Sequence, residues 1–204
     1  MAATDSLEEL LAGVIDGLGA AVPDPRHDWH QPVICCLDET GRAVSRTVVL
    51  RGFSRGADGE PRLRFHTDSR SRKVAEILAS PEVCWLFYDR ERKVQLRALA
   101  SAHVHRDDEL AEEAWAAATL SSRRCYLAPH APSSVQESWD PNLPEHLLRT
   151  LPGQEESEAG RARFAVVETR VTELDRLELR HDGHVRSRWR WLADGSVDAH
   201  WLAP

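Results

Sequence analysis

The sequence predicts a mainly antiparallel β domain with flanking helices. About seven short runs rich in β-branched and aromatic residues are separated by turns that contain glycine, aspartate or proline. Only a few stretches have the apolar spacing of a helix, and they do not alternate with the strands as in a parallel βαβ series. With 204 residues, of which 42% are apolar, the chain is long enough for one packed domain, which we expect to span residues 1–204.

Residues 6–20 predict an N-terminal amphipathic helix, because apolar side chains recur there at helical spacing. Ser6 is a candidate N-cap before Glu8 and Glu9. Pro23 follows shortly afterwards and cannot continue a helix, so the helix is expected to end before it.

The chain from there to residue 105 predicts strands joined by tight turns and interrupted by one helix. Thr40 and Gly41 form a turn between the first two strands. The helix begins at Asp68 or Ser69 and ends before Pro81. In chain order the strands cover residues 32–39, 43–53, 62–67, 83–89 and 93–105, and the helix lies within 68–81.

The C-terminal half predicts one more helix, a long loop and a closing set of strands. Residues 106–122 have helical apolar spacing, whereas residues 121–144 contain four prolines and predict a loop. The acidic stretch 153–160 is polar throughout and predicts a flexible surface segment. The closing strands cover residues 162–180, 184–194 and 196–204.

Composition argues against several kinds of partner and location. A formal net charge of −7 repels nucleic acids and anionic membrane surfaces at long range. No apolar run approaches the roughly 20 residues of a membrane span, and the N-terminus carries acids where a signal peptide needs a basic flank. We therefore expect a cytoplasmic protein that binds neither nucleic acid nor membrane. Reduced core residues are expected at Cys35, Cys36, Cys84 and Cys125.

Histidine pairs are the candidates for metal ligands. They are His27 with His30, His103 with His105, and His181 with His184. None of these pairs has a third ligand at a suitable spacing, so we expect no metal site.

Basic and hydroxyl side chains gather in two neighbouring segments. Arg46 and Arg51 bracket an apolar strand, and residues 67–73 contain three cations and three hydroxyl groups at a strand-to-helix junction. Arginine forks and a helix N-terminus are the donors that a phosphate monoester needs. The alternative is an ordinary solvated helix start. Arg46 and Arg51 are five positions apart, so a regular strand would aim them at opposite faces; either the strand bends or bulges, or they serve different parts of a ligand.

The order of these segments resembles a known family. RTVVLR, then FHTDSRSRK, a strand pair and VQLRALA, within residues 31–102, is similar to the pyridoxamine-5′-phosphate-oxidase-like flavoproteins, and a looser likeness continues to the terminal LAP. The resemblance implies an antiparallel split β-barrel, FMN as cofactor, and a homodimer with flavin sites at its interface. It also implies an FMN-dependent oxidoreductase, and no catalytic residue is assigned.

The same resemblance implies the cofactor-binding residues. The strand from Arg46 to Arg51 would lie along the flavin, Arg72 and Lys73 with Ser71 nearby would hold the phosphate, and Gln95 would reach the flavin, in this family sometimes from the partner subunit. The full set is Arg46, Thr47, Val48, Val49, Leu50, Arg51, His66, Thr67, Ser71, Arg72, Lys73, Gln95, Ser133 and Arg188.

Departures from the family pattern concern the substrate. His66 stands where the family has a tyrosine, Arg51 where its oxidases have a substrate-facing lysine, and residues 185–187 do not reproduce their Arg-Leu-His segment. We therefore expect a small phosphorylated or carboxylated substrate and poor oxidation of pyridoxamine 5′-phosphate. The alternatives are a non-catalytic flavin-binding or storage protein, or the same barrel holding deazaflavin F420 or haem.

Overall fold

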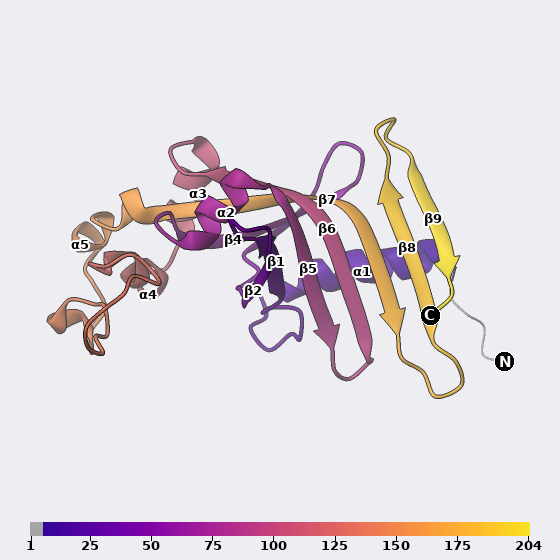
Figure 1. The fold of residues 1–204 in the computed structure, drawn as a ribbon, viewed down its shortest axis with the longest axis horizontal. Coiled ribbons are helices and arrows are strands. Elements are labelled where there is room, and N and C mark those ends of the chain that lie inside the picture. The colour runs from indigo at the N-terminus through magenta and orange to yellow at the C-terminus, as the bar shows by residue number, and fades with distance from the viewer. Residues whose placement is uncertain (1–5) are drawn as a thin grey trace.

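The computed structural model describes residues 6–204, whose strands form one nine-stranded sheet with helices at its side and at one end (Figure 1). The elements, in chain order and with η for a 3-10 helix, are α1 (Leu7–Ala21), β1 (Val33–Leu37), β2 (Ala43–Thr47), β3 (Gly52–Arg55), β4 (Pro61–Asp68), α2 (Arg72–Ala79), β5 (Glu82–Asp89), β6 (Val94–His105), α3 (Glu109–Ala117), α4 (Leu120–Arg123), η1 (Arg124–Leu127), η2 (Glu145–Leu147), α5 (Gln154–Glu158), η3 (Arg161–Arg163), β7 (Phe164–Glu178), β8 (Val185–Trp191) and β9 (Val197–Leu202). The mainly antiparallel β class with flanking helices is confirmed.

The sheet divides at β7. Its strand order is β2-β1-β5-β6-β7-β4-β3, and every pairing is antiparallel. The first part of β7, Phe164–Arg170, pairs with β4, and the last part, Glu173–Glu178, pairs with β8, while β6 follows β7 along both parts. One long strand therefore joins the β3–β4 end of the sheet to the β8–β9 end, as in a split barrel.

Helix α1 covers one face of the sheet. Ser6 Oγ accepts a hydrogen bond from the Glu9 backbone N–H, and the Glu9 carboxylate accepts one from Ser6 N. This capping box begins the helix at the N-cap that the sequence predicted. Leu10, Val14 and Leu18 are buried in the main core with the sheet. The opposite face of β5–β9, toward the viewer in Figure 1, carries no helix among the described residues.

Two predicted elements are interrupted in the structure. The strand expected over 43–53 ends at Thr47 and resumes at Gly52. The chain between them still bonds on both sides, because Leu50 N donates to His30 O and Arg51 N donates to Arg64 O. The helix expected over 106–122 is two helices, α3 and α4, separated by the extended residues Ala118 and Thr119.

Other boundaries differ because distant contacts determine them. Strand β4 continues to Asp68 through pairing with the first residue of β7, so α2 begins at Arg72 and not at Asp68. The stretch 153–160, expected to be flexible, contains the short helix α5, in which Ser157 is fully buried and accepts a hydrogen bond from Arg123. The expected loop 121–144 begins with the end of α4 and η1. None of the helices within residues 6–204 is long and apolar enough to cross a membrane.

Candidate functional site

Lys73 lies in a group of buried and half-buried polar side chains between β2, β4 and the start of α2. Its Nζ donates a hydrogen bond to Thr67 Oγ1 at 3.0 Å, and the Thr67 and Ser71 hydroxyl oxygens are 3.2 Å apart. Ser71 is the N-cap residue of α2, yet its side chain makes no capping bond. We refer to Arg46, Thr67, Ser71 and Lys73 as the Lys73 cluster.

Arg46 brings a second cation to this cluster from β2. Its Nη2 donates to Glu76 Oε2 at 2.7 Å, and its Nη1 donates to Cys36 Sγ at 3.1 Å, so two neighbouring elements fix the guanidinium. Burial lowers the pKa of Lys73, and the charge of Arg46 lowers it further. A bound anion would relieve both effects. Two cations, two hydroxyl groups and a helix N-terminus match the needs of a phosphate monoester, so the residues present fit the phosphate of FMN.

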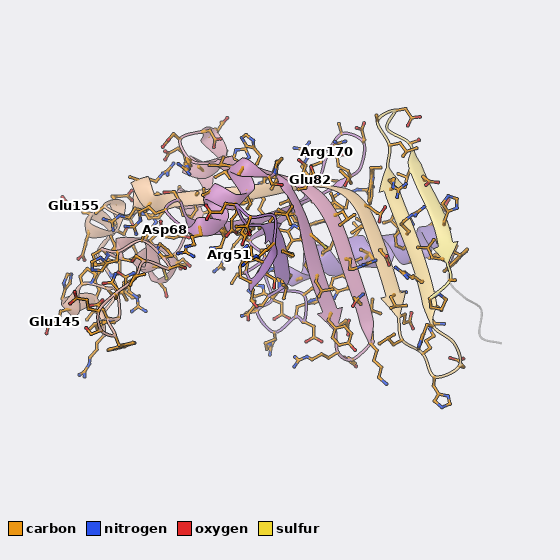
Figure 2. All side chains as sticks on the ribbon, in the orientation of Figure 1. Arg51, Asp68, Glu82, Glu145, Glu155 and Arg170 are labelled. Carbon is orange, nitrogen blue, oxygen red and sulfur yellow. The ribbon has the colours of Figure 1, made fainter. Side chains whose placement is uncertain are left out.

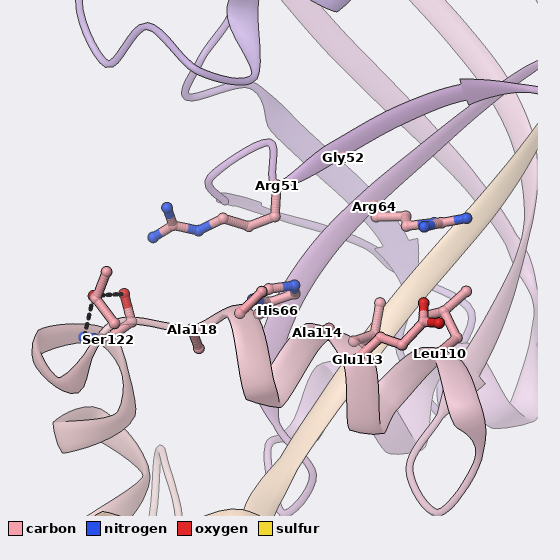
Figure 3. Close-up of a pocket in the computed structure, with 12 residues that line it drawn as sticks. Arg51, Gly52, Arg64, His66, Leu110, Glu113, Ala114, Ala118 and Ser122 are labelled. Atoms are coloured by element: carbon pink, nitrogen blue, oxygen red, sulfur yellow. Dashed lines mark hydrogen bonds between the residues drawn. The ribbon is translucent and has the colours of Figure 1, made fainter. Parts of the chain in front are cut away.

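Arg51, at the other end of the same segment, lines a separate cavity of about 390 Å³, shown in Figure 3. Figure 2 places Arg51 between the strands and the helical end of the molecule. Arg51 is exposed, and among the described residues its side chain has no hydrogen bond or ion pair. We call this cavity the Arg51 pocket; its lining residues are Arg51, Gly52, Arg64, His66, Leu110, Glu113, Ala114, Ala117, Ala118, Thr119, Ser122 and Val166.

His66 forms the floor of the Arg51 pocket on β4. Its ring packs edge-on against Phe164, with the ring centres 4.9 Å apart. Burial, and then the nearby charge of Arg51, lower the pKa of His66 to about 4. His66 is therefore neutral at pH 7 and offers one donor and one acceptor without a charge.

Helices α3 and α4 supply the opposite wall, and it is largely apolar. Three alanines of this wall, Ala114, Ala117 and Ala118, line the cavity. Beyond them, the Thr119 hydroxyl donates to Ser122 Oγ at 3.2 Å, which leaves the Ser122 O–H free to donate to a ligand. Sequence reasoning read this region only as an amphipathic helix, because alanine carries no chemical group that marks a site.

The structure brings part of the predicted set together. Arg46, Thr67, Ser71 and Lys73 form the Lys73 cluster, whereas Arg51 and His66 line the Arg51 pocket. Between Arg46 and Arg51 the strand is interrupted, which is the irregularity that the sequence left open, and the two guanidinium groups lie in different surroundings.

The connecting residues and Arg72 have simpler positions. Val48 and Leu50 are buried in the main core, and Val49 is half-buried. Thr47 is exposed at the end of β2, and Arg72 is exposed on the first turn of α2.

Gln95, Ser133 and Arg188 lie apart from both sites within this chain. Gln95 is on β6 opposite Tyr88 of β5. Ser133 is exposed in the loop after η1, with a positive φ of 67°. Arg188 is on β8, five strands from β2 in the sheet order, and lies 3.7 Å from Asp198. Within residues 6–204, neither the Lys73 cluster nor the Arg51 pocket includes any of these three residues.

Within the part of the chain that the structure describes, no three His, Cys, Asp or Glu side chains gather as metal ligands. The His103 and His105 rings contact each other at 4.5 Å between centres, and His105 is bonded to Asp108.

Comparison with known proteins adds a family match and several similar folds. The model of the pyridoxamine 5′-phosphate oxidase FMN-binding domain matches residues 21–106. This range contains the Lys73 cluster together with Arg51 and His66 of the Arg51 pocket. No curated protein matches the sequence.

Three solved structures share the fold. A pyridoxamine 5′-phosphate oxidase-related, FMN-binding protein from Nostoc punctiforme has a TM-score of 0.73 at 18% identity, covering 94% of this chain and 96% of that one. PhzG from Burkholderia lata has a TM-score of 0.62 at 18% identity, covering 100% of this chain and 94% of that one. A general stress protein 26-related protein from Clostridium acetobutylicum has a TM-score of 0.53 at 10% identity, covering 89% of this chain and 95% of that one.

The family match and the shared fold agree with the resemblance seen in the sequence, because the matched range holds the RTVVLR and FHTDSRSRK segments. Residues 21–106 of the chain match the pyridoxamine 5′-phosphate oxidase FMN-binding domain family.

Proposed function

We propose that the protein binds FMN and acts as a flavin-dependent oxidoreductase on a small anionic substrate. The observation that carries the proposal is the pair of sites at the two ends of residues 46–51. Arg46 belongs to a buried cluster that fits a phosphate group, and Arg51 lines an open cavity with an unpaired guanidinium. A cofactor anchored at the first site and a substrate held at the second would be separated only by this short segment.

The residues divide the work as follows. Arg46, Lys73, Thr67 and Ser71 would hold the phosphate by charge-assisted hydrogen bonds. Bound FMN would supply the electron transfer, which protein side chains do not provide. Arg51 would bind the anionic end of the substrate, and the alanine wall would exclude water from the cavity.

The substrate class is supported by the unpaired Arg51 and by one similar structure. PhzG from Burkholderia lata was solved in complex with tetrahydrophenazine-1-carboxylic acid, which is a carboxylated ring compound. Its 18% identity to this chain carries no residue-level argument, and the expectation of a small anion rests on the guanidinium itself.

We also propose that two copies of the chain form a homodimer through the open face of the sheet. Leu86, Tyr88 and Leu99 are 38%, 43% and 45% exposed, and the β5–β6 register places them on the same face as Gln95. Burying such an apolar face is favourable. A second copy on this face would bring its Gln95 toward a site that lacks this residue within one chain.

The test is a spectrum and a titration of the purified protein. A flavin absorbance spectrum, or saturable FMN binding with one FMN per chain, is the expected result. A deazaflavin or haem spectrum would show that the protein binds that cofactor and not FMN. Absence of FMN binding would overturn the proposal. If the reduced bound flavin is reoxidised by air, and no small anion that is tested reoxidises it faster, a storage protein would be favoured. Light scattering should give a dimer mass, and a monomer mass with flavin bound would contradict the dimer.

A further inference from the structure

The Arg51 pocket has little positive charge available to a ligand. Two arginines line it, but Arg64 donates from Nε to Glu168 Oε2 at 2.5 Å and is thereby neutralised. Among the described lining residues, Arg51 is the only cation without an ionic partner. A ligand in this pocket would therefore meet one available guanidinium.

The other ionisable groups of the pocket add no positive charge. Glu113 of α3 is exposed and lines the same cavity. His66 is neutral at pH 7, since burial and then Arg51 hold its pKa near 4. A phosphate monoester, which carries nearly two negative charges at pH 7, would gain one cation and face one carboxylate. A carboxylate, with a single charge, matches one guanidinium fork.

The shape of the lining favours a flat apolar body on that carboxylate. Ala114, Ala117 and Ala118 leave a wall of methyl groups, and the aromatic ring of His66 lines the same cavity. Figure 3 shows Arg51 reaching across the cavity toward the end that carries Ser122, with Glu113 and Arg64 at the other end. Both Arg51 and Ser122 therefore offer donors at one end of the cavity, and Ala114 and Ala118 lie between that end and Glu113.

We propose that the Arg51 pocket selects planar monocarboxylates over phosphate monoesters. The Arg51 fork and the Ser122 hydroxyl bind the carboxylate, and the ring lies between His66 and the alanine wall. This inference rests on the proposed function, because it names the substrate class of the same site.

Three matched probes separate charge from shape: 2-naphthoate, 2-naphthyl phosphate and 2-naphthamide share one ring system and carry about one, two and no charges. Their dissociation constants are measured by calorimetry on the FMN-loaded protein and on the protein without added FMN. FMN uptake is recorded first, so failure of the proposed function and failure of this inference give different results. We expect 2-naphthoate to bind at least about tenfold more tightly than either of the other two, the effect of one charge-assisted pair.

Two substitutions test the assignment, and a third is the control. Arg51→Ala should remove the preference for naphthoate over naphthamide. Ala118→Arg adds a second cation to the wall and should strengthen 2-naphthyl phosphate binding by about tenfold. Arg42→Ala, at an exposed arginine in the turn between β1 and β2, should change neither the preference for naphthoate nor the binding of 2-naphthyl phosphate.

The outcomes are decisive in both directions. Preference for naphthoate that disappears in Arg51→Ala supports the inference. Equal or tighter binding of 2-naphthyl phosphate by the unaltered protein overturns it, as does a preference that survives in Arg51→Ala. If Arg51→Ala fails to fold, the Ala118→Arg result decides: no gain in phosphate binding would show that charge does not limit the pocket. Lack of binding by all three probes would also overturn it.

Discussion

The two arginines at the ends of residues 46–51 lie in opposite surroundings. Arg46 is held by Glu76 and Cys36 beside Lys73, in a cluster whose hydroxyl groups are buried. Arg51 is exposed, and its side chain has no partner among the described residues. A side chain fixed by its neighbours suits a permanent cofactor, because no ordering entropy remains to be lost on binding. A free side chain suits a ligand that enters and leaves.

The largest effect is expected at the Lys73 cluster. Replacing Arg72 and Lys73 together by alanine removes two charged donors near the α2 N-terminus, each worth about 1.5–3 kcal/mol. FMN affinity should fall at least about a hundredfold. Because Lys73 is half-buried and bonded to Thr67 whereas Arg72 is exposed, Lys73→Ala alone should account for most of the loss.

Riboflavin is the control for this double substitution, since it lacks the phosphate. Its dissociation constant, measured by flavin fluorescence, should not change. An equal loss of FMN and riboflavin affinity would mean that the variant is misfolded or that these residues hold the ring and not the phosphate.

A second prediction concerns the wall of the Arg51 pocket. Arg123 is buried and donates to Trp115 O at 2.7 and 3.2 Å and to Ser157 Oγ at 3.2 Å, so it ties α3, α4 and α5 together. Arg123→Ala should lower the free energy of unfolding by about 2–3 kcal/mol, as expected for lost hydrogen bonds to a charged group. Urea unfolding measures this loss, and Arg149→Ala, at an exposed arginine, is the control.

Arg123→Ala also tests whether the two sites are independent. The hydrogen bonds of Arg123 go to Trp115, Ser157 and Glu158 and not to the Lys73 cluster, so FMN affinity should stay within about threefold while binding in the Arg51 pocket weakens. Parallel loss at both sites would show that they act as one unit.

Features that depend only on neighbouring residues could be predicted from the sequence. The five-residue spacing of Arg46 and Arg51 indicated an irregular strand or separate roles, and the N-cap at Ser6 follows from the local sequence. The start of α2 could not be predicted, because pairing of Asp68 with Phe164 extends β4. The sequence 153–160 is polar, and contacts with Arg123 and Trp115, more than thirty positions away, hold its helix in place.

The candidate site was predictable where it carries charge. Lysine, arginine and hydroxyl residues at a helix start indicated the Lys73 cluster, whereas the alanines of the opposite wall carry no such signal. Gln95 and Arg188 were assigned from the family resemblance and lie away from the Lys73 cluster in the sheet, so they would reach a flavin only through the proposed homodimer.

A third prediction uses the pKa of His66. It is lowered to about 4 in the folded protein, against about 6.5 in the unfolded chain, so the unfolded state takes up the proton first as pH falls. Stability is therefore unaffected above about pH 7 and is lost between about pH 6.5 and 4, with about 2 kcal/mol gone by pH 5. Urea unfolding at pH 7.5 and 5.0 measures the loss. His66→Gln, which does not titrate, should reduce the difference by that amount, and an unchanged difference would place the titrating group elsewhere.

The smallest expected effect links Arg51 to His66. Burial is the main cause of the low pKa of His66, and repulsion by Arg51 is the lesser one. Arg51→Ala should therefore raise the pKa of His66 while leaving it below 6.5, because the ring stays packed against Phe164. The measurement is an NMR titration of the His66 ring protons, assigned by their loss in His66→Gln. Arg55→Ala, at an exposed arginine on β3 outside the cavity, is the matched control and should leave this pKa unchanged. A His66 pKa that does not move in Arg51→Ala would show that the guanidinium points away from the ring in solution, and the Arg51 pocket would then lack its cation.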